Sequence, residues 1–319
     1  MFLAGVNVKP KVLIADGLEQ AGQDILRLEA RVEDRSGILA PDLFRMIHDV
    51  DGLIVRSRTQ VSGDLIQVAP KLKVVGRAGV GVDNIDLQAA ARRSVMVVNA
   101  PVATTGAVAE LVIGLILALA RQIPLAASAM RDGSWLKKEL IGSEIEGKKL
   151  GVIGMGQIGT AVSQKAAALG MSVLGFDPYL DEVEIARRSA RPLPFEQLCS
   201  HSDFITLHVP LNDGTRLMIN EPAIQIMKTG VRLICTSRGG IVDETALLGA
   251  LESGKIAGAA LDVFQQEPPG QIPLISHPNL IATPHIGAQT LEAQSRAARD
   301  IAEEVIAALS GLPLRWRIV

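Results

Sequence analysis

Lys149-Leu150-Gly151-Val152-Ile153-Gly154-Met155-Gly156-Gln157-Ile158-Gly159 is the stretch that decides the fold. An apolar run typical of a strand breaks into a glycine-rich turn, and a helical pattern follows as far as Gly170. A second apolar run, Met171 to Phe176, leads directly to Asp177. A lone G-x-G-x-x-G is common by chance, but a preceding strand, a following helix and an acid about 20 residues further on together indicate a dinucleotide site.

Each residue of this motif has a physical role in such a site. Gly154 permits the tight turn, Gly156 lets a pyrophosphate approach the backbone, and Gly159 lets the helix pack closely on the strand. The free N–H groups at the helix start face the phosphates. Asp177 accepts hydrogen bonds from the ribose hydroxyls and repels a 2′-phosphate, which favours NAD over NADP. The alternative is an ordinary strand-turn-helix with structural glycines, against which the placement of Asp177 argues.

Length and charge restrict the class of protein. A chain of 319 residues, 48% of them hydrophobic, is long enough for two domains with separate cores. The net charge of -2 and the pI near 6.2, without a basic block, argue against nucleic acid or an anionic membrane as a partner. We therefore expect a small-molecule partner.

Cysteine usage and hydropathy restrict the compartment. Cys199 and Cys235 are too few for a disulfide framework and lack metal-ligand spacing, so we predict no metal site and a reducing cytoplasm. Met1 to Lys11 has no basic start followed by a long apolar segment, which argues against secretion. Leu111 to Ala120 is the most apolar window but is far short of the ~20 residues that span a bilayer. We interpret it as a buried helix at a domain or subunit interface.

Strand-like and helical patterns alternate on both sides of the glycine turn, which indicates parallel sheets flanked by helices. The first part has strand-like runs at Lys11–Ala15, Gly52–Val55, Leu72–Gly76 and Val95–Asn99. After the two strands of the dinucleotide motif, four more follow at Phe204–Val209, Val231–Thr236, Ala257–Asp262 and Leu280–Thr283. These six predict a doubly wound sheet. A last helix, Leu291–Leu309, is expected to return to the first domain.

Three chemically competent side chains follow the last three of these strand-like runs. They are Arg238, Glu267 and His285. Because the carboxyl ends of the strands line the ligand crevice of such a sheet, we expect them at one edge.

Together these residues suit hydride transfer between a 2-hydroxy acid and nicotinamide. A guanidinium such as Arg238 holds a carboxylate with two parallel hydrogen bonds. An imidazole such as His285 takes and returns the hydroxyl proton. Glu267, bonded to the other ring nitrogen, would fix the tautomer and favour the imidazolium. The hydride chemistry itself belongs to the cofactor.

Each of the three has a structural alternative. Arg238, before Gly-Gly, would brace a turn; Glu267, before Pro-Pro, would be a solvated loop acid; and His285 would be a packed loop histidine. The other histidines are interpreted as structural: His48, His201, His208 and His277.

Five motifs in this order resemble those of the NAD-dependent D-2-hydroxyacid dehydrogenases, and the similarity extends over nearly the whole chain. Besides the glycine turn they are Val75-Gly76-Arg77-Ala78-Gly79-Val80-Gly81-Val82-Asp83-Asn84, Arg238-Gly239-Gly240-Ile241-Val242-Asp243-Glu244, Gly258-Ala259-Ala260-Leu261-Asp262-Val263-Phe264 and Pro284-His285-Ile286-Gly287-Ala288.

The resemblance implies that Arg238, Glu267 and His285 are the catalytic triad and that NAD is the cofactor. It implies cofactor contacts from Gly154, Gly156, Gln157, Ile158, Gly159, Asp177, Val209, Thr236, Ser237, Arg238, Asp262, His285, Gly287 and Ala288. It implies substrate contacts from Arg56, Ser57, Arg77, Ala78, Gly79 and Thr104, and from Lys137 or Lys138. The basic residues among these favour a phosphorylated acid, D-3-phosphoglycerate, although solvated lysines and a surface arginine would look the same.

The predicted fold class is α/β, with two doubly wound parallel-sheet domains. A Rossmann NAD-binding domain, residues 104–289, would be inserted in a flavodoxin-like substrate-binding domain, residues 1–103 and 290–319. The apolar helix from Leu111 to Ala120 suggests a homodimer built on the cofactor domain. Because the chain stops at Val319, we do not expect the C-terminal regulatory domain of longer relatives or inhibition by serine through it.

Two departures and two rivals limit the assignment of substrate and function. Thr104 stands in a loop where the family often has Asn, and Cys235 stands where an Asn often precedes the arginine segment; we interpret this cysteine as a small apolar filler. The same chemistry on glyoxylate, hydroxypyruvate or D-lactate remains open. A rival of another class is an NAD-responsive corepressor-like binding protein with the same fold and the same triad.

Overall fold

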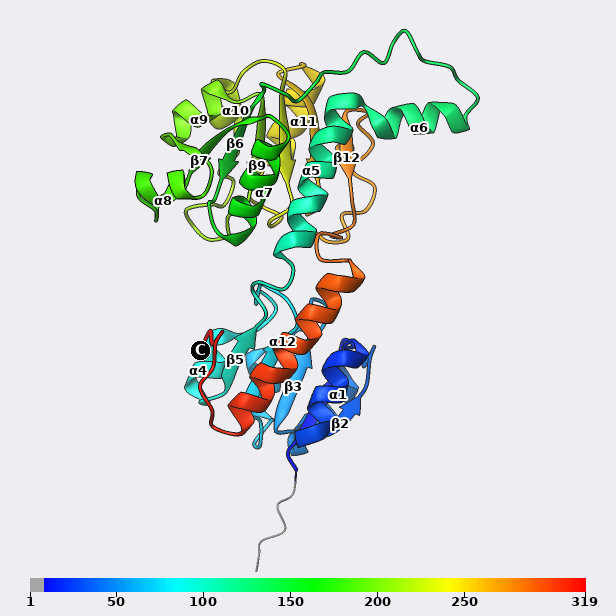
Figure 1. The fold of residues 1–319 in the computed structure, drawn as a ribbon. Coiled ribbons are helices and arrows are strands. Elements are labelled where there is room, and N and C mark those ends of the chain that lie inside the picture. The colour runs from blue at the N-terminus through cyan, green and yellow to red at the C-terminus, as the bar shows by residue number, and fades with distance from the viewer. Residues whose placement is uncertain (1–8) are drawn as a thin grey trace, which may run out of the picture. The chain divides into compact units, whose positions relative to one another are not determined.

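The chain folds into two compact α/β units (Figure 1). The computed structural model describes residues 9–319. The first eight residues, part of the N-terminal stretch interpreted above as lacking a secretion signal, lie outside the described residues. The first unit extends to Thr104 and resumes over Ala288–Val319, and the second unit is the inserted segment Thr105–Gly287. The boundaries expected from the sequence lie within two residues of these.

The first unit is built on a five-stranded parallel sheet in the order β2-β1-β3-β4-β5. This is the flavodoxin-like order expected for the first domain. The strands are β1 (Lys11–Ile14), β2 (Arg31–Asp34), β3 (Gly52–Val55), β4 (Val74–Arg77) and β5 (Met96–Asn99). Helices α1 (Gln20–Glu29), α2 (Ala40–Met46), α3 (Gly63–Gln67) and α4 (Leu87–Arg92) connect them, with a 3-10 turn η1 (Ile47–Asp49) after α2.

The sequence patterns missed β2. The strand β2 reads Arg-Val-Glu-Asp and lies at the sheet edge, where none of its residues is fully buried. An edge strand of this kind lacks the continuous apolar run that marks a strand buried on both faces, such as β3.

The last helix, α12 (Leu291–Leu309), packs against α1 and the sheet of the first unit. Its residues Ile301 and Val305 are fully buried. The helix approaches the sheet so closely that a Cβ at Gly76 would lie 2.6 Å from Val305 Cγ2. After the helix the chain forms an antiparallel bridge with β5, between Arg317 and Val98. The C-terminal helix therefore belongs to the core of the first unit.

The second unit is built on a seven-stranded parallel sheet in the order β12-β11-β10-β9-β6-β7-β8. Its strands are β6 (Lys149–Ile153), β7 (Ser172–Phe176), β8 (Arg191–Pro192), β9 (Phe204–Leu207), β10 (Val231–Cys235), β11 (Ile256–Leu261) and β12 (Leu280–Ala282). The order reverses between β6 and β9, as in a doubly wound dinucleotide fold. The expected count of six strands was wrong because β8, only two residues long, is too short to show a pattern.

Helices cover both faces of this sheet. On one face, α5 (Thr105–Arg121) and α7 (Gln157–Ala168) pack against each other and the strands, while α9 (Phe195–His201), α10 (Glu221–Ile226) and α11 (Glu244–Glu252) contribute to the core on the other. The helices α6 (Ile123–Arg131) and α8 (Glu182–Arg187) complete the unit.

The apolar helix predicted at Leu111 to Ala120 lies within α5 and packs into its own unit. Val112 and Ile116 are fully buried beside strand and α7 residues. Among residues 9–319 no single helix is long and apolar enough to cross a membrane; α5 and α6 reach that length only as a pair bent by 66°.

Candidate active site

The glycine turn joins β6 to α7, and its three glycines have different surroundings. Gly154 has φ +90, and a Cβ there would lie 2.7 Å from the backbone of His208 on the neighbouring strand segment. A Cβ at Gly159 would lie 2.0 Å from the carbonyl oxygen of Gly154. A Cβ at Gly156 would meet no described heavy atom within 4 Å. The first and last glycines therefore serve packing, whereas the middle one borders open space that a phosphate group needs.

Asp177 follows β7 and is tied to the glycine turn. Its Oδ2 accepts the N–H of Met155 at 2.9 Å, and its Oδ1 accepts the N–H of Tyr179 at 3.0 Å. A carboxylate offers about four lone-pair positions, so both oxygens retain acceptor capacity for hydroxyl groups. The Asp177 carboxylate is thus held beside the glycine turn, where it can accept hydrogen bonds from the hydroxyl groups of a ribose.

The surroundings of the turn fit a dinucleotide. No side chain caps the start of α7 at Gly156, so a phosphate is a natural partner for its N–H groups. At the carboxyl end of β10, the buried Oγ1 of Thr236 has no hydrogen-bond partner among residues 9–319. Buried hydroxyl groups are rarely left unpaired, so this atom is suited to a bound polar group. Both residues are among those expected to contact NAD.

His285 and Glu267 form a hydrogen-bonded pair at the carboxyl ends of β12 and β11. The distance from His285 Nδ1 to Glu267 Oε2 is 2.7 Å, and the side chains are 44% and 35% exposed. The other carboxylate oxygen, Oε1, accepts the N–H of Phe264 at 3.1 Å. With Nδ1 occupied by the carboxylate, Nε2 is the ring nitrogen left for a substrate.

The backbone at His285 is strained. Its φ is +52, a left-handed conformation that is uncommon outside glycine. Such strain persists only when neighbouring contacts fix it, and it is often found at functional sites.

Asp262, at the end of β11, anchors the loop that carries His285. Its side chain is fully buried, and it accepts hydrogen bonds from Thr283 Oγ1 at 2.6 Å, Ile286 N at 2.8 Å and Gly287 N at 2.8 Å. The resemblance suggested only a cofactor contact for this residue. Its observed partners give it a structural role on both sides of His285.

Arg238 follows β10 in a loop that packs directly on the loop of Glu267. A Cβ at Gly239 would lie 1.8 Å from the carbonyl oxygen of Phe264, so only glycine permits this approach. Arg238 Nη1 donates to the carbonyl of Ser237 at 2.6 Å. At the start of α11, Glu244 Oε1 accepts the N–H of Gln265 at 2.6 Å and ties the two loops together. Glu244 is part of one of the sequence motifs described above. Its contact with Gln265 could not be predicted from the sequence, because the two residues are 21 positions apart in the chain.

An apolar pocket of about 330 Å³ lies beside the His285–Glu267 pair. Its lining is mostly nonpolar and consists of Phe264, Glu267, Pro268, Pro269, Ile275, Ala282, Thr283, Pro284 and His285. The pocket therefore offers an apolar wall beside a hydrogen-bonded pair that is itself partly exposed.

Most expected substrate residues lie in the first unit. Arg56 is near Glu19, with 3.8 Å between Nη1 and Oε1, and Ser57 is exposed. The guanidinium of Arg77 lies across Gly79, where a Cβ would be 1.7 Å from Nη1. The other expected residues there are the buried Ala78 and Thr104, and Lys137 and Lys138 are exposed in the second unit.

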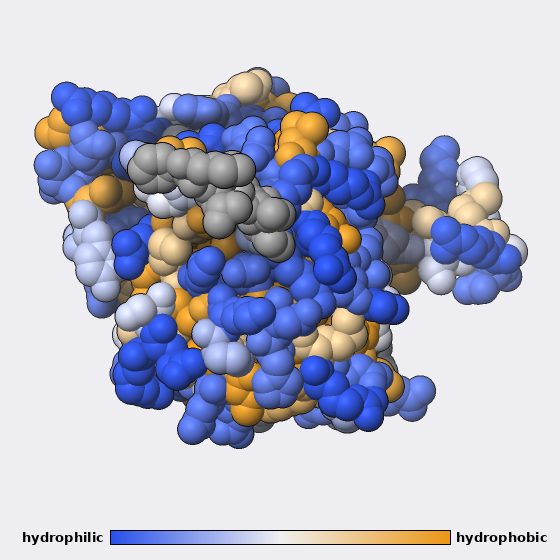
Figure 2. Space-filling view, turned by 90° about the horizontal axis from the view of Figure 1, so that it is seen from below, coloured by the Kyte–Doolittle hydropathy of each residue, from blue (hydrophilic) through white to orange (hydrophobic). Residues whose placement is uncertain are grey.

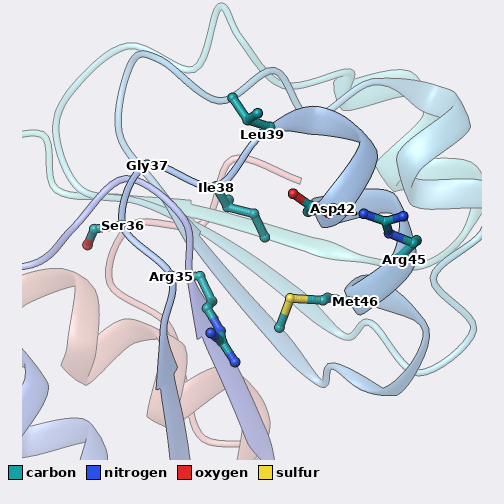
Figure 3. A pocket seen from close by; sticks show the side chains of 8 residues that line it. All are labelled: Arg35, Ser36, Gly37, Ile38, Leu39, Asp42, Arg45 and Met46. Atoms are coloured by element: carbon teal, nitrogen blue, oxygen red, sulfur yellow. Dashed lines mark hydrogen bonds and ion pairs between the residues drawn. The ribbon is translucent and has the colours of Figure 1, made fainter.

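A further pocket of about 450 Å³ lies in the first unit, beyond β2 (Figure 3). Its two arginines are already paired, Arg35 with Glu33 at 2.8 Å and Arg45 with Asp42. Because both charges are compensated within the unit, the pocket offers no strong anion site. Within residues 9–319, no group of three or more His, Cys, Asp or Glu side chains is arranged to hold a metal ion.

The second unit thus has the fold and turn of a dinucleotide-binding domain, with an acid-base pair at the strand ends. The NAD-binding domain model of the D-isomer specific 2-hydroxyacid dehydrogenases matches residues 113–287. The chain belongs to this family, which confirms the resemblance seen in the sequence and NAD as the cofactor.

Curated relatives and solved structures agree with this assignment. The D-3-phosphoglycerate dehydrogenase of Methanocaldococcus jannaschii is 46% identical over 94% of this chain, and that of Sus scrofa is 44% identical over 98%. The chain spans 58% of the length of each. The TT0316 protein from Thermus thermophilus is 34% identical with a TM-score of 0.88, covering 97% of this chain and 100% of that one. A D-lactate dehydrogenase from Aquifex aeolicus, complexed with NAD and lactic acid, is 28% identical with a TM-score of 0.82, covering 94% and 96%.

Proposed function

We propose that the protein oxidises D-3-phosphoglycerate to 3-phosphooxypyruvate with reduction of NAD. The observation that carries the proposal is the 2.7 Å hydrogen bond between His285 and Glu267, at the strand ends of an NAD-binding domain. The identity of 42–46% to D-3-phosphoglycerate dehydrogenases supports this substrate. This step would begin a route to serine.

The side chains divide the reaction between them. His285 Nε2 takes the proton of the C2 hydroxyl while the C2 hydrogen departs with its electron pair, so that the C2 oxygen becomes a ketone. Bound NAD supplies the acceptor for that hydride. Glu267 stabilises the imidazolium through Nδ1, and Arg238 holds the substrate carboxylate and polarises the C2 oxygen.

The phosphate is assigned to Arg56 and Ser57, with Lys137 or Lys138. The rival substrates are unphosphorylated acids, and solved relatives include a glyoxylate reductase and D-lactate dehydrogenases. The test compares kcat/KM for D-3-phosphoglycerate, D-glycerate and D-lactate. We expect phosphoglycerate to be preferred and Arg56→Ala to reduce that preference about tenfold or more, because a charge-assisted hydrogen bond is lost. Equal kcat/KM values for the three acids would refute the phosphate assignment.

A corepressor-like binding protein would use the same fold without turnover. Because such binding proteins keep the same triad, the hydrogen-bonded pair of His285 and Glu267 does not by itself distinguish them from an enzyme. NADH production from phosphoglycerate, with His285→Gln as a control, distinguishes the two. Activity that is absent from the unaltered protein, or unaffected by the substitution, would contradict the enzymatic assignment.

We also propose a homodimer in the cytoplasm. The sequence suggested α5 as its interface, but α5 is largely buried in its own unit. Exposed apolar side chains lie instead on α6 and the segment after it, which extend away from the sheet of the second unit in Figure 1. They are Ile123, Leu125, Met130, Trp135 and Ile141.

A further inference from the structure

Asp16 lies just beyond the carboxyl end of β1 and has a buried carboxylate. Its side chain is only 3% exposed. It accepts hydrogen bonds from the loop of residues 56–59, which follows β3. Oδ2 accepts the N–H groups of Arg56 at 2.8 Å and Thr59 at 3.0 Å, and Oδ1 accepts Thr59 Oγ1 at 2.5 Å. One carboxylate therefore fixes both ends of the 56–59 loop.

The same carboxylate separates the roles of the two arginines in this loop. The guanidinium of Arg58 lies 3.0 Å from Asp16 Oδ1 and donates to the carbonyl oxygens of Ala15 at 2.9 Å and Ile38 at 3.2 Å. Arg58 is thus committed to internal contacts. Within residues 9–319, the one ion pair of the Arg56 guanidinium is with Glu19, at 3.8 Å, which is longer than a hydrogen bond.

The opposite side of the loop is held by Asn84. Its Nδ2 donates to the carbonyl oxygens of Arg56 at 3.0 Å and Thr59 at 2.6 Å. Asp16 and Asn84 together satisfy the N–H and the carbonyl of the same two residues. The loop is consequently preorganised, and a ligand does not have to supply the free energy of ordering it.

We propose that Asp16 is a positioning residue for substrate recognition: it commits Arg58 to the fold and presents Arg56 and Ser57 to an anionic group of the substrate. The identity of that group as a phosphate rests on the proposed function. The sequence patterns did not single out Asp16, because its partners lie 40 or more residues away.

Asp16 is ionised at neutral pH, as this role requires. Burial by itself would raise its pKa, but hydrogen bonds from Thr59 and the Arg56 N–H, with the charge of Arg58, lower the pKa below its ordinary value. An Asn at this position has one carboxamide oxygen that can accept, and its NH2 group would face the N–H or O–H groups that the second carboxylate oxygen now accepts. At least one donor of Arg56, Arg58 or Thr59 would therefore lose its hydrogen bond.

The test compares Asp16→Asn and Asp16→Ala with a matched control, Asp51→Asn. Asp51 also accepts a backbone N–H, from Lys11 at 2.9 Å, and pairs with a cation, Lys73 at 3.2 Å, but it precedes β3, whereas Asp16 follows β1. We expect Asp16→Asn to raise KM for D-3-phosphoglycerate about tenfold and Asp16→Ala to raise it further, with kcat and KM for NAD unchanged. The preference for phosphoglycerate over D-glycerate should fall in parallel, whereas Asp51→Asn should alter stability alone.

Hydrogen exchange of the 56–59 loop provides a second readout that needs no turnover. Faster amide exchange there in Asp16→Asn, but not in Asp51→Asn, is expected if Asp16 orders the loop. The positioning role is overturned if both Asp16 variants show the same KM and the same exchange as the unaltered protein. If the unaltered protein fails to turn over phosphoglycerate, the proposed function fails, while loop exchange and binding of inorganic phosphate still test Asp16. Loss of exchange protection without weaker phosphate binding would reduce Asp16 to a purely structural residue and also refute the proposal.

Discussion

At the scale of the residue, the acid-base pair is the feature that distinguishes this site from a simple cofactor site. His285→Gln removes the proton acceptor, and we expect kcat to fall about 10²–10⁴-fold, the range typical of general-base catalysis. Glu267→Gln keeps a hydrogen-bonding side chain at 2.7 Å but removes the charge that stabilises the imidazolium, so a smaller fall is expected. Steady-state kinetics measures both effects, and an NAD titration of the Glu267→Gln variant by fluorescence should show unchanged affinity. A variant of His285 with unaltered kcat would contradict the mechanism.

We expect His208 to make the second unit sensitive to acid. Burial lowers the pKa of this histidine to about 3, so it stays neutral in the folded protein, whereas the unfolded chain takes up a proton below the ordinary value of 6.5. Between pH 3 and pH 6.5 the unfolded state therefore binds more protons than the folded state. The free energy of unfolding consequently falls as the pH drops from about 6.5 towards 3. Because His208 is only partly buried, we expect the loss between pH 7 and pH 5 to be at most about 2 kcal/mol.

Replacing His208 by Gln should reduce this loss of stability on acidification. Its Nε2 is 3.0 Å from Thr206 Oγ1, a contact that an amide can reproduce. Calorimetry of the two proteins at pH 7 and pH 5 measures the difference, with His201→Gln, an exposed histidine of the same unit, as the control. An equal decrease of Tm in all three proteins would show that His208 does not carry the effect.

At the scale of the element, the sequence was informative where a strand or helix has a continuous apolar pattern. The strands β6, β7, β9, β10 and β11 were predicted to within two residues at each end, and α12 was predicted with its observed bounds. The polar edge strand β2 and the two-residue β8 have no such pattern. The hydrogen bond between His285 and Glu267 was also expected, because strand order alone places neighbouring strand ends together.

The supporting contacts of the site were not predictable in the same way. Asp262, Glu244 and Asp16 act on backbone N–H groups 21 or more residues distant, and only the folded loops define which donors are near. The sequence identifies the residues that perform chemistry more readily than those that hold them in place. The roles of the cofactor and substrate residues remain predictions.

Two glycines of the same turn should respond differently to replacement by Ala: one change should lower stability, and the other should weaken NAD binding. An Ala at position 159 would place its Cβ 2.0 Å from a carbonyl oxygen, so Gly159→Ala should destabilise the second unit by about 1–3 kcal/mol. An Ala at position 156 meets nothing within 4 Å, so Gly156→Ala should fold normally but weaken NAD binding about tenfold or more, by filling the space of the diphosphate. Thermal unfolding and NAD titration of both variants measure this contrast. Equal NAD affinity in Gly156→Ala and the unaltered protein would refute the assigned cofactor position.

At the scale of the whole molecule, surface hydrophobicity is uneven. Figure 2 shows a face on which hydrophilic residues predominate and hydrophobic ones are scattered, as is normal for a folded domain. On α6 and the segment after it, by contrast, Met130 is 56% exposed, Trp135 73% and Ile141 80%. Large exposed side chains grouped on one segment indicate an interaction surface. A two-fold dimer is the commonest assembly that covers such a surface, because each copy presents the same patch to the other.

The assembly is testable by replacing apolar side chains of that segment with charges. The chain has a mass of 33.8 kDa, and light scattering after size exclusion should give twice that value for the unaltered protein. Trp135→Asp with Ile141→Asp should yield a monomer that remains folded, because both side chains are mainly exposed and contribute little to the core of their own unit. Leu28→Asp, at a 70% exposed position of α1 in the first unit, is the matched control and should leave the dimer intact. A monomeric unaltered protein would contradict the dimer itself, whereas dissociation by the control alone would move the interface to the first unit.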